Sequence, residues 1–176
     1  NSWQGYSISS NMSFMGRGST DIGIYSQGYG WGFYMTYGGL CGIGNSTTSS
    51  SYRLYVDGGI YSTSTIIAYS DARKKENVVT VDNALNKVLQ LRGVYYNKIK
   101  ADLEENQGKR EMGVIAQEVE SVLPEVVSYA KDVDEYGVQY GNLAGLFIEA
   151  IKDQQKIIED MRNEIADMKE KLNGNN

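Results

Sequence analysis

One short stretch of the sequence places a nucleophilic side chain close to a basic one. It begins at Ser70, and Lys75 follows five residues later. The chain contains no histidine, which excludes a Ser-His-Asp triad, a Cys-His pair and a zinc ion held by imidazole groups. A serine nucleophile therefore needs another base, and lysines serve as bases where burial or neighbouring cations lower their pKa. Lys75 is the candidate base for Ser70.

The spacing of this pair restricts its local structure. Side chains five positions apart do not share a helical face, because neighbours on a helix are three or four positions apart. Ser70 is therefore expected on a turn that precedes a helix or strand. Arg73 and Lys74 add positive charge beside Lys75, and Asp71 adds negative charge. Serines and lysines are commonly found near one another, so these residue types alone do not establish chemistry.

The composition of the chain changes at Ser70. Residues 1–69 contain 13 of the 20 glycines and 9 of the 14 tyrosines, but their charged side chains are only Arg17, Asp21, Arg53 and Asp57. The net charge of −5 therefore comes entirely from residues 70–176. We predict one domain over residues 1–69 and a second over residues 70–176.

The first of these regions is typical of β-structure. Short runs of aromatic and branched side chains, separated by glycines, predict short strands at Tyr6–Ile8, Ile22–Tyr25 and Gly32–Met35. Alternation from Tyr52, a turn at Asp57-Gly58-Gly59 and apolar residues up to Ala68 predict a hairpin. So few large apolar residues bury little area, and intertwining with copies of the same chain would supply the missing burial. A small monomeric β-sandwich is the alternative.

Aromatic side chains in this region are candidates for ligand contacts. They are able to stack on sugar rings or to pack against a partner, although in strands a structural role is more common. A host-surface glycan or protein receptor is therefore a possible partner of residues 1–69, through Trp3, Tyr29, Trp31, Tyr34 and Tyr37.

The second region alternates between helix and strand signals, which predicts an α+β fold. Helices are expected over Val81–Leu91, starting at Asp82 or Asn83, and over Gln117–Leu123, where Pro124 ends the helix. A charged loop is expected over Ala101–Arg110. The remaining apolar runs predict strands at Val94–Asn97, Val126–Tyr129 and Gly137–Tyr140.

The strongest pattern is a heptad repeat in the long helix predicted over residues 142–172. Apolar residues alternate at spacings of three and four, which predicts a parallel coiled coil. Gln154 is a polar group in this seam and would fix register and copy number. The alternative is an amphipathic helix packed on its own domain. The seam consists of Phe147, Ile151, Gln154, Ile158, Met161, Ile165, Met168 and Leu172.

Composition argues against several other classes of protein. A lone Cys41 cannot form an intrachain disulfide. The negative net charge argues against nucleic acid as the main partner, and the absence of an 18-residue apolar run argues against a membrane span. No metal or cofactor site is indicated. Because Asn1 is not an initiator, further domains are expected upstream.

Motifs spread over the second half resemble a known family. They occur in this order: Ser70-Asp71-x-Arg73-x-Lys75-x-Asn77, Leu91-x-Gly93-Val94-x-Tyr96, Gly113–Val119, Leu123–Val127, Tyr140–Leu143 and Phe147–Lys152. This pattern resembles the self-cleaving intramolecular chaperone domain of phage endosialidase tailspikes, tail fibres and neck appendages, which recurs in myelin regulatory factor. Leu54–Ser62 also looks like the β-stranded stem that often precedes this domain in viral fibres.

The resemblance implies roles for individual residues. The family's Ser-Lys dyad falls on Ser70 and Lys75. Its supporting positions fall on Asp71, Arg73, Asn77, Gln117 and Glu118, whereas Lys74 stands where the family usually carries leucine.

The resemblance also implies that three chains trimerise through this domain, fold a stalk and then cleave themselves once beside Ser70. It points to the Ser70–Asp71 bond. Ser70 attacking the Tyr69 carbonyl through a five-membered ring would instead cut Tyr69–Ser70. The expected location is the virion, after assembly in the host cytoplasm, with the released domain absent from the mature particle.

The sequence also bears on three other functions. An uncleaved trimeric fibre tip that binds a receptor is the main alternative. A membrane-bound transcription factor is disfavoured, because residues 1–69 lack a basic surface and no membrane helix follows Leu172. A glycosidase is disfavoured because no paired carboxylates are assignable in residues 1–69.

Overall fold

The computed structural model describes residues 4–9, 12–17, 21–27, 30–44, 48–99 and 108–174. The chain forms two compact units. The first comprises residues 1–69 with the segments 98–109 and 130–135, and the second comprises residues 70–97, 110–129 and 136–176.

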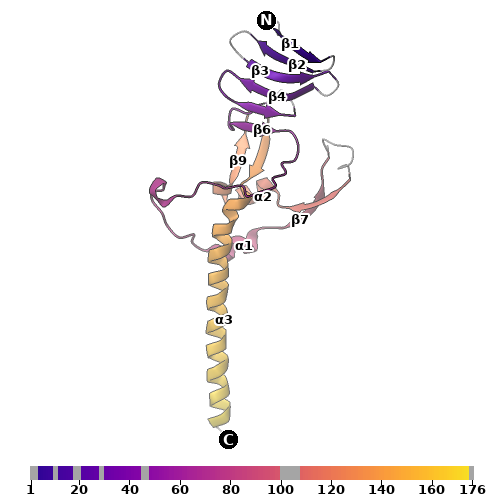
Figure 1. Cartoon of the computed structure of the whole chain (residues 1–176). Coiled ribbons are helices and arrows are strands. Elements are labelled where there is room, and N and C mark those ends of the chain that lie inside the picture. Colours follow the sequence, from indigo (N-terminus) through magenta and orange to yellow (C-terminus); the bar gives the residue numbers. More distant parts are fainter. Residues whose placement is uncertain are drawn as a thin grey trace. The chain divides into compact units, whose positions relative to one another are not determined.

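The first unit contains a six-stranded sheet in which strands adjacent in sequence lie side by side (Figure 1). The strands β1 to β5 form an antiparallel meander. The three predicted runs, Tyr6–Ile8, Ile22–Tyr25 and Gly32–Met35, lie within β1, β3 and β4, so the predicted short strands are confirmed. The bounds are β1 (Gln4–Ser9), β2 (Met12–Arg17), β3 (Asp21–Ser26), β4 (Gly30–Thr36), β5 (Cys41–Ile43) and β6 (Leu54–Val56).

The predicted hairpin over Tyr52–Ala68 is wrong in its second strand. β6 instead pairs in parallel with β5, in the register Cys41 with Leu54. After Asp57 the chain leaves the sheet, and residues 58–71 contain no strand. The Ser/Thr-rich segment that follows has few side chains able to cover a sheet face, and its isoleucines, such as Ile67, are exposed.

Aromatic packing replaces an aliphatic core on the N-terminal sheet. Trp31 makes edge-to-face contacts with Tyr25 and Tyr34, with ring centroids 5.4 and 5.5 Å apart. A Cβ atom on Gly23 would lie 2.7 Å from the Trp31 ring and 2.5 Å from a backbone oxygen, so the close approach requires glycine. The Tyr34 hydroxyl donates to Asp21 at 3.1 Å. Trp31 and Tyr34 thus have structural roles, whereas Trp3 and Tyr29 lie outside the described residues.

The C-terminal half combines helices with two small two-stranded sheets, which confirms the α+β prediction. The strands predicted at 94–97, 126–129 and 137–140 overlap β7, β9 and β10, and β8 is a strand that was not predicted. Part of the predicted loop 101–110 lies outside the described residues. The bounds are η1 (Ala72–Lys74), α1 (Ala84–Gln90), β7 (Val94–Asn97), β8 (Arg110–Gly113), α2 (Ala116–Glu120), η3 (Pro124–Val126), β9 (Val127–Ala130), β10 (Glu135–Val138), η4 (Tyr140–Asn142) and α3 (Leu143–Gly174).

The second unit has an aliphatic core at the start of α3. Helix α1 packs against α3, and α2 and η3 cover the same end. Asp153 on α3 accepts a hydrogen bond of 3.3 Å from the Leu85 amide, so it satisfies one of the free amides at the start of α1. The buried residues are Ala84, Val119, Leu123, Val126, Leu143, Leu146 and Ala150.

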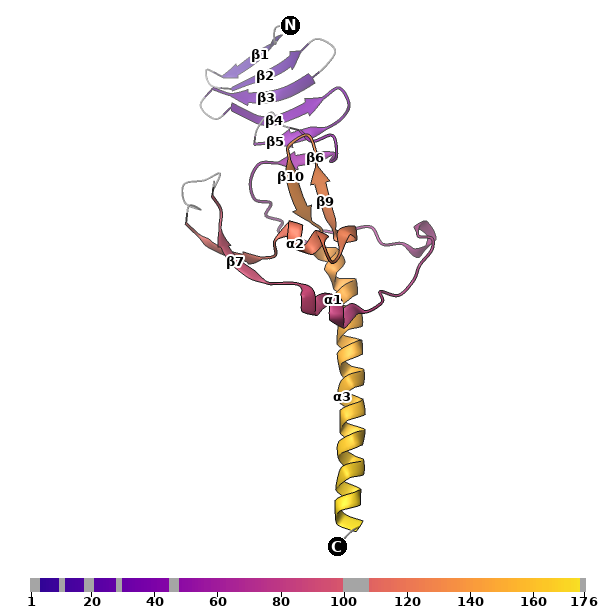
Figure 2. The same ribbon diagram turned by 180° about the vertical axis from the view of Figure 1, so that it is seen from behind.

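Most of α3 extends beyond this core. Figures 1 and 2 show its C-terminal part running past α1 without a neighbouring element. Its 32 residues confirm the predicted long helix. Among the described helices, none has both the length and the apolar character needed to cross a bilayer.

Candidate active site

The turn after Tyr69 brings Ser70 and Lys75 together. Ser70 lies just before η1, and the Lys75 amide closes the turn by donating to the Ala72 carbonyl at 3.1 Å. This reversal returns the Lys75 side chain to Ser70, and its Nζ donates to Ser70 Oγ at 2.9 Å. A nucleophile and a base within hydrogen-bond distance form the minimal arrangement for acyl transfer. Both residues are exposed in the single chain.

Asp71 fixes the shape of this turn. Its carboxylate accepts from the Arg73 amide at 2.9 Å, which caps η1, and also from the Arg73 guanidinium, with an Asp71 Oδ2 to Arg73 NH2 distance of 2.6 Å. These bonds lower the pKa of Asp71 and raise that of Arg73. Because the guanidinium is paired with Asp71, the positive charge expected from Arg73 beside Lys75 is largely compensated.

Asn77 ends the segment in a left-handed conformation, with φ of 53°. Asparagine tolerates this conformation better than most residues, because its short side chain bonds locally to the backbone. Its presence in the motif is therefore explained by backbone geometry at this turn.

Gln117 and Glu118 lie on α2, apart from the dyad. Glu118 forms a two-point ion pair with Arg92, with distances of 3.1 and 2.5 Å, and this pairing lowers the pKa of Glu118. Figures 1 and 2 show η1 projecting to one side of α2 in both views. Glu118 thus links α2 to the segment after α1, while Gln117 is exposed.

A polar cluster that the sequence did not single out explains three further motif positions. The Tyr96 hydroxyl donates to Glu111 at 3.0 Å, and this bond is the main reason why the pKa of Tyr96 is raised. Tyr140 lies against Gly113, where an added Cβ would be 2.8 Å from the Tyr140 hydroxyl. The recurrence of Tyr96, Gly113 and Tyr140 in the motifs was the available signal, but only the fold places them together.

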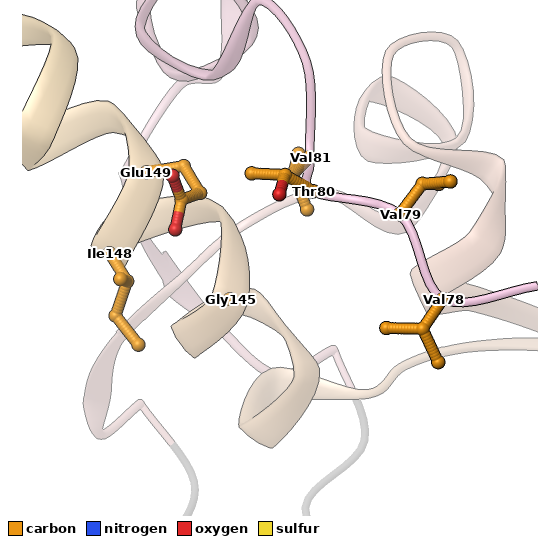
Figure 3. A pocket seen from close by; sticks show the side chains of 7 residues that line it. All are labelled: Val78, Val79, Thr80, Val81, Gly145, Ile148 and Glu149. Atoms are coloured by element: carbon orange, nitrogen blue, oxygen red, sulfur yellow. The ribbon is translucent and has the colours of Figure 1, made fainter. Parts of the chain in front are cut away.

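A groove begins directly after this turn. It has a volume of about 290 Å³ and lies between residues 78–81 and the first turns of α3. Figure 3 shows Val78 and Val79 on the extended segment and Ile148 on the helix. Val78 is 77% and Val79 is 85% exposed. The lining is mostly apolar and includes neither Ser70 nor Lys75, so the groove is a largely apolar surface separate from the candidate dyad.

The predicted seam of α3 lies beside the face that packs on the core. Leu143, Leu146 and Ala150 are buried by their own unit. The apolar seam residues, from Phe147 to Leu172, are between 39% and 70% exposed, and Gln154 is also exposed. A single chain therefore leaves the seam uncovered.

Comparison with known proteins agrees with the motif analysis. Residues 70–128, which begin at the candidate nucleophile, match the peptidase S74 family, described as chaperone of endosialidase. This confirms the resemblance inferred from the motifs.

Relatives over longer stretches include phage tail fibre proteins. The long tail fiber protein Gp37 of Enterobacteria phage Ox2 is 28% identical over 174 residues, and that of phage M1 is 28% identical over 170 residues. Each alignment covers 90% of this chain and 66% of the relative, so the chain spans just under two thirds of their length. The myelin regulatory factor homolog 1 of Caenorhabditis elegans is 33% identical over 66% of this chain and 12% of its own length.

Proposed function

We propose that residues 70–176 are an intramolecular chaperone of a phage tail fibre, which trimerises, assists folding of residues 1–69 and then releases itself by one self-cleavage next to Ser70. The contact of 2.9 Å between Lys75 Nζ and Ser70 Oγ carries this proposal. The family match and the tail fibre relatives support the chaperone and fibre role. A fibre protein of this kind resides in the virion.

The chemistry proposed for the dyad balances with one water molecule. Ser70 Oγ attacks the Tyr69 carbonyl carbon while Lys75 Nζ takes the hydroxyl proton. The Tyr69–Ser70 amide then breaks, its nitrogen is protonated and an ester forms. Water hydrolyses the ester and restores the hydroxyl. Cutting the Ser70–Asp71 bond requires a water or a second chain as nucleophile, because Ser70 reaches its own carbonyl only through a strained four-membered ring.

Trimer formation is proposed as the event that completes the site. Lysine acts as a base in surroundings that exclude water, whereas Ser70 and Lys75 are exposed in a single chain. The uncovered seam of α3 and the exposed Val78 and Val79 would be buried by neighbouring copies. Cleavage would then follow assembly, after which the stalk is kinetically trapped.

The exposure of the dyad also favours one alternative function. If no neighbour covers Ser70 and Lys75, the chain remains intact as a trimeric fibre tip that binds a host receptor through residues 1–69 or through upstream domains. Of the proposed receptor-contacting aromatic residues that the structure describes, which are Trp31, Tyr34 and Tyr37, Tyr37 is the most accessible, with 86% of its surface exposed.

Intact-mass measurement of the purified chain separates these functions. We expect two fragments for the wild type, either 1–69 with 70–176 or 1–70 with 71–176, and one uncut chain for Ser70→Ala. Ser64→Ala is the matched control in the same exposed segment and should be cut. An uncut wild-type trimer would contradict the cleavage and support the fibre tip.

A further inference from the structure

A turn from the C-terminal half contacts a serine-rich loop of the N-terminal half within the first compact unit. This unit includes residues 130–135 together with residues 1–69. Ser49 Oγ donates to Asp132 Oδ1 at 3.0 Å, and the Ser50 amide donates to Asp132 Oδ2. The bonded residues are more than 80 positions apart in sequence, so these contacts are tertiary. We name Asp132, Ser49 and Ser50 the Asp132 clasp.

The loop presents its donors in a fixed arrangement. Ser49 is fully buried, and its Oγ also accepts from the Ser51 amide at 3.2 Å. The Tyr52 amide donates to the Ser49 carbonyl at 3.2 Å, which closes the turn. The hydroxyl proton of Ser49 and the amide of Ser50 therefore both reach the carboxylate, and charge-assisted hydrogen bonds of this kind are stronger than neutral ones. The bond from the Ser50 amide is the main reason why the pKa of Asp132 is lowered.

We propose that the turn 130–135 recognises the loop 48–52 of the stalk, and that the Asp132 clasp delays the release that follows cleavage at Ser70, because it keeps the two products together until the clasp opens. The inference rests on the proposed function, because the loop precedes the cleavage site along the chain and Asp132 follows it. The clasp would thus be a contact between chaperone and client that survives loss of the covalent link.

The chemical groups of the clasp define the kind of segment that Asp132 binds. The carboxylate is met by a hydroxyl and a backbone amide, and the nearby cation Arg53 donates instead to the Gly38 carbonyl at 3.0 Å. Recognition therefore depends on hydrogen bonds to a buried serine turn rather than on an ion pair. Binding should be nearly insensitive to ionic strength, unlike an exposed ion pair.

Amide hydrogen exchange in a Ser70→Ala background tests the contact without cleavage. We expect exchange of the Ser50 amide to become about tenfold faster in Asp132→Ala, because the amide loses its acceptor. Asp132→Asn retains one acceptor oxygen and should give a smaller change. Asp134→Asn is the matched control, since it makes the same charge change on the same turn and asparagine tolerates the left-handed conformation found there. Equal exchange in all variants would overturn the proposal.

Retention of the cleaved C-terminal fragment by the stalk tests the role proposed for the Asp132 clasp. In the cleaving chain, size exclusion at neutral pH should show the C-terminal fragment co-eluting with the stalk, with retention reduced about tenfold in Asp132→Ala but not in Asp134→Asn. Retention that is unaffected by Asp132→Ala would overturn the role of the clasp. An uncut wild type would contradict the proposed function instead, and the exchange experiment would still decide the contact.

Discussion

The two halves of the chain differ in how they bury apolar side chains. In residues 70–176, seven buried aliphatic residues gather around the start of α3 and form a core within one chain. Among the described side chains of residues 1–69, the fully buried positions are Gly23, Gly42 and Ser49, and no large aliphatic residue is buried. Burial of apolar surface is the main favourable term in folding, and the described part of the first half has no apolar core like that of the second half. This difference in burial fits the proposal that residues 70–176 assist the folding of residues 1–69.

Producing the two halves as separate chains should have the largest effect, which is on the ability of residues 1–69 to fold. We expect residues 70–176 alone to unfold cooperatively on heating, because their core is complete. Residues 1–69 alone should remain unfolded or aggregate, because their sheet buries too little apolar area. Circular dichroism and protease resistance of each fragment measure this, and a stable isolated stalk would remove the need for a chaperone.

Replacing the proposed base, Lys75, should have the second-largest effect, which is on the rate of cleavage. Lys75→Arg keeps the positive charge but removes a group able to accept a proton, so cleavage should slow by about 100-fold or more. Lys74→Arg makes the same change one residue away and should cleave normally. The rate follows from the fraction of cut chain over time on a denaturing gel. Equal rates would show that the 2.9 Å contact has no catalytic role.

A polar residue in the seam should weaken assembly of the template. Ile158→Ser removes apolar burial proposed between chains, with an expected cost of about 2 kcal/mol per chain. Ile157→Ser alters the same residue type next to the seam and should have a smaller effect on association. Sedimentation equilibrium gives the copy number and its concentration dependence. If both variants stay trimeric to the same dilution, the coiled-coil prediction is wrong.

Adding a methyl group inside the template should lower its stability. Gly113→Ala places a Cβ against the Tyr140 hydroxyl, and we expect a loss of about 1–3 kcal/mol. Gly141 has open space at its Cβ position and no left-handed backbone, so Gly141→Ala is the control. The melting temperatures of both variants, measured by thermal unfolding, show the difference in stability. Equal melting temperatures would mean that the tyrosine cluster around Gly113 adapts freely.

The smallest effect expected is the pH dependence of the turn at the cleavage site. Because Arg73 lowers the pKa of Asp71, the Asp71 carboxylate stabilises the turn above the ordinary aspartate pKa. That stabilisation should be lost as the pH falls through the lowered value. A nuclear magnetic resonance titration of the Arg73 amide follows the change. A midpoint at or above the ordinary value would contradict the capping contact.

Local signals in the sequence were reliable where they depended on periodicity or on turn chemistry. A helix was predicted over Val81–Leu91, and α1 lies within that range. The five-residue spacing of Ser70 and Lys75 predicted a turn at Ser70 before a helix or strand, and Ser70 indeed precedes η1. The hairpin over Tyr52–Ala68 failed because strand pairing depends on partners distant in sequence, and β5 was the partner available to β6. The ion pair of Glu118 with Arg92 was likewise unpredictable, since it joins segments separated by 26 residues.

The sequence by itself indicated the change of composition at Ser70, the α+β character of the second half, the long helix and the family that residues 70–128 match. These features follow from composition, periodicity and motif order, which can be read along the chain without knowledge of contacts between distant segments. Only the tertiary structure decided that Tyr96, Gly113 and Tyr140 form one cluster, that Asp153 caps α1 and that Asp132 meets Ser49 and Ser50. Such contacts depend on packing between distant segments, and packing is a property of the folded chain as a whole.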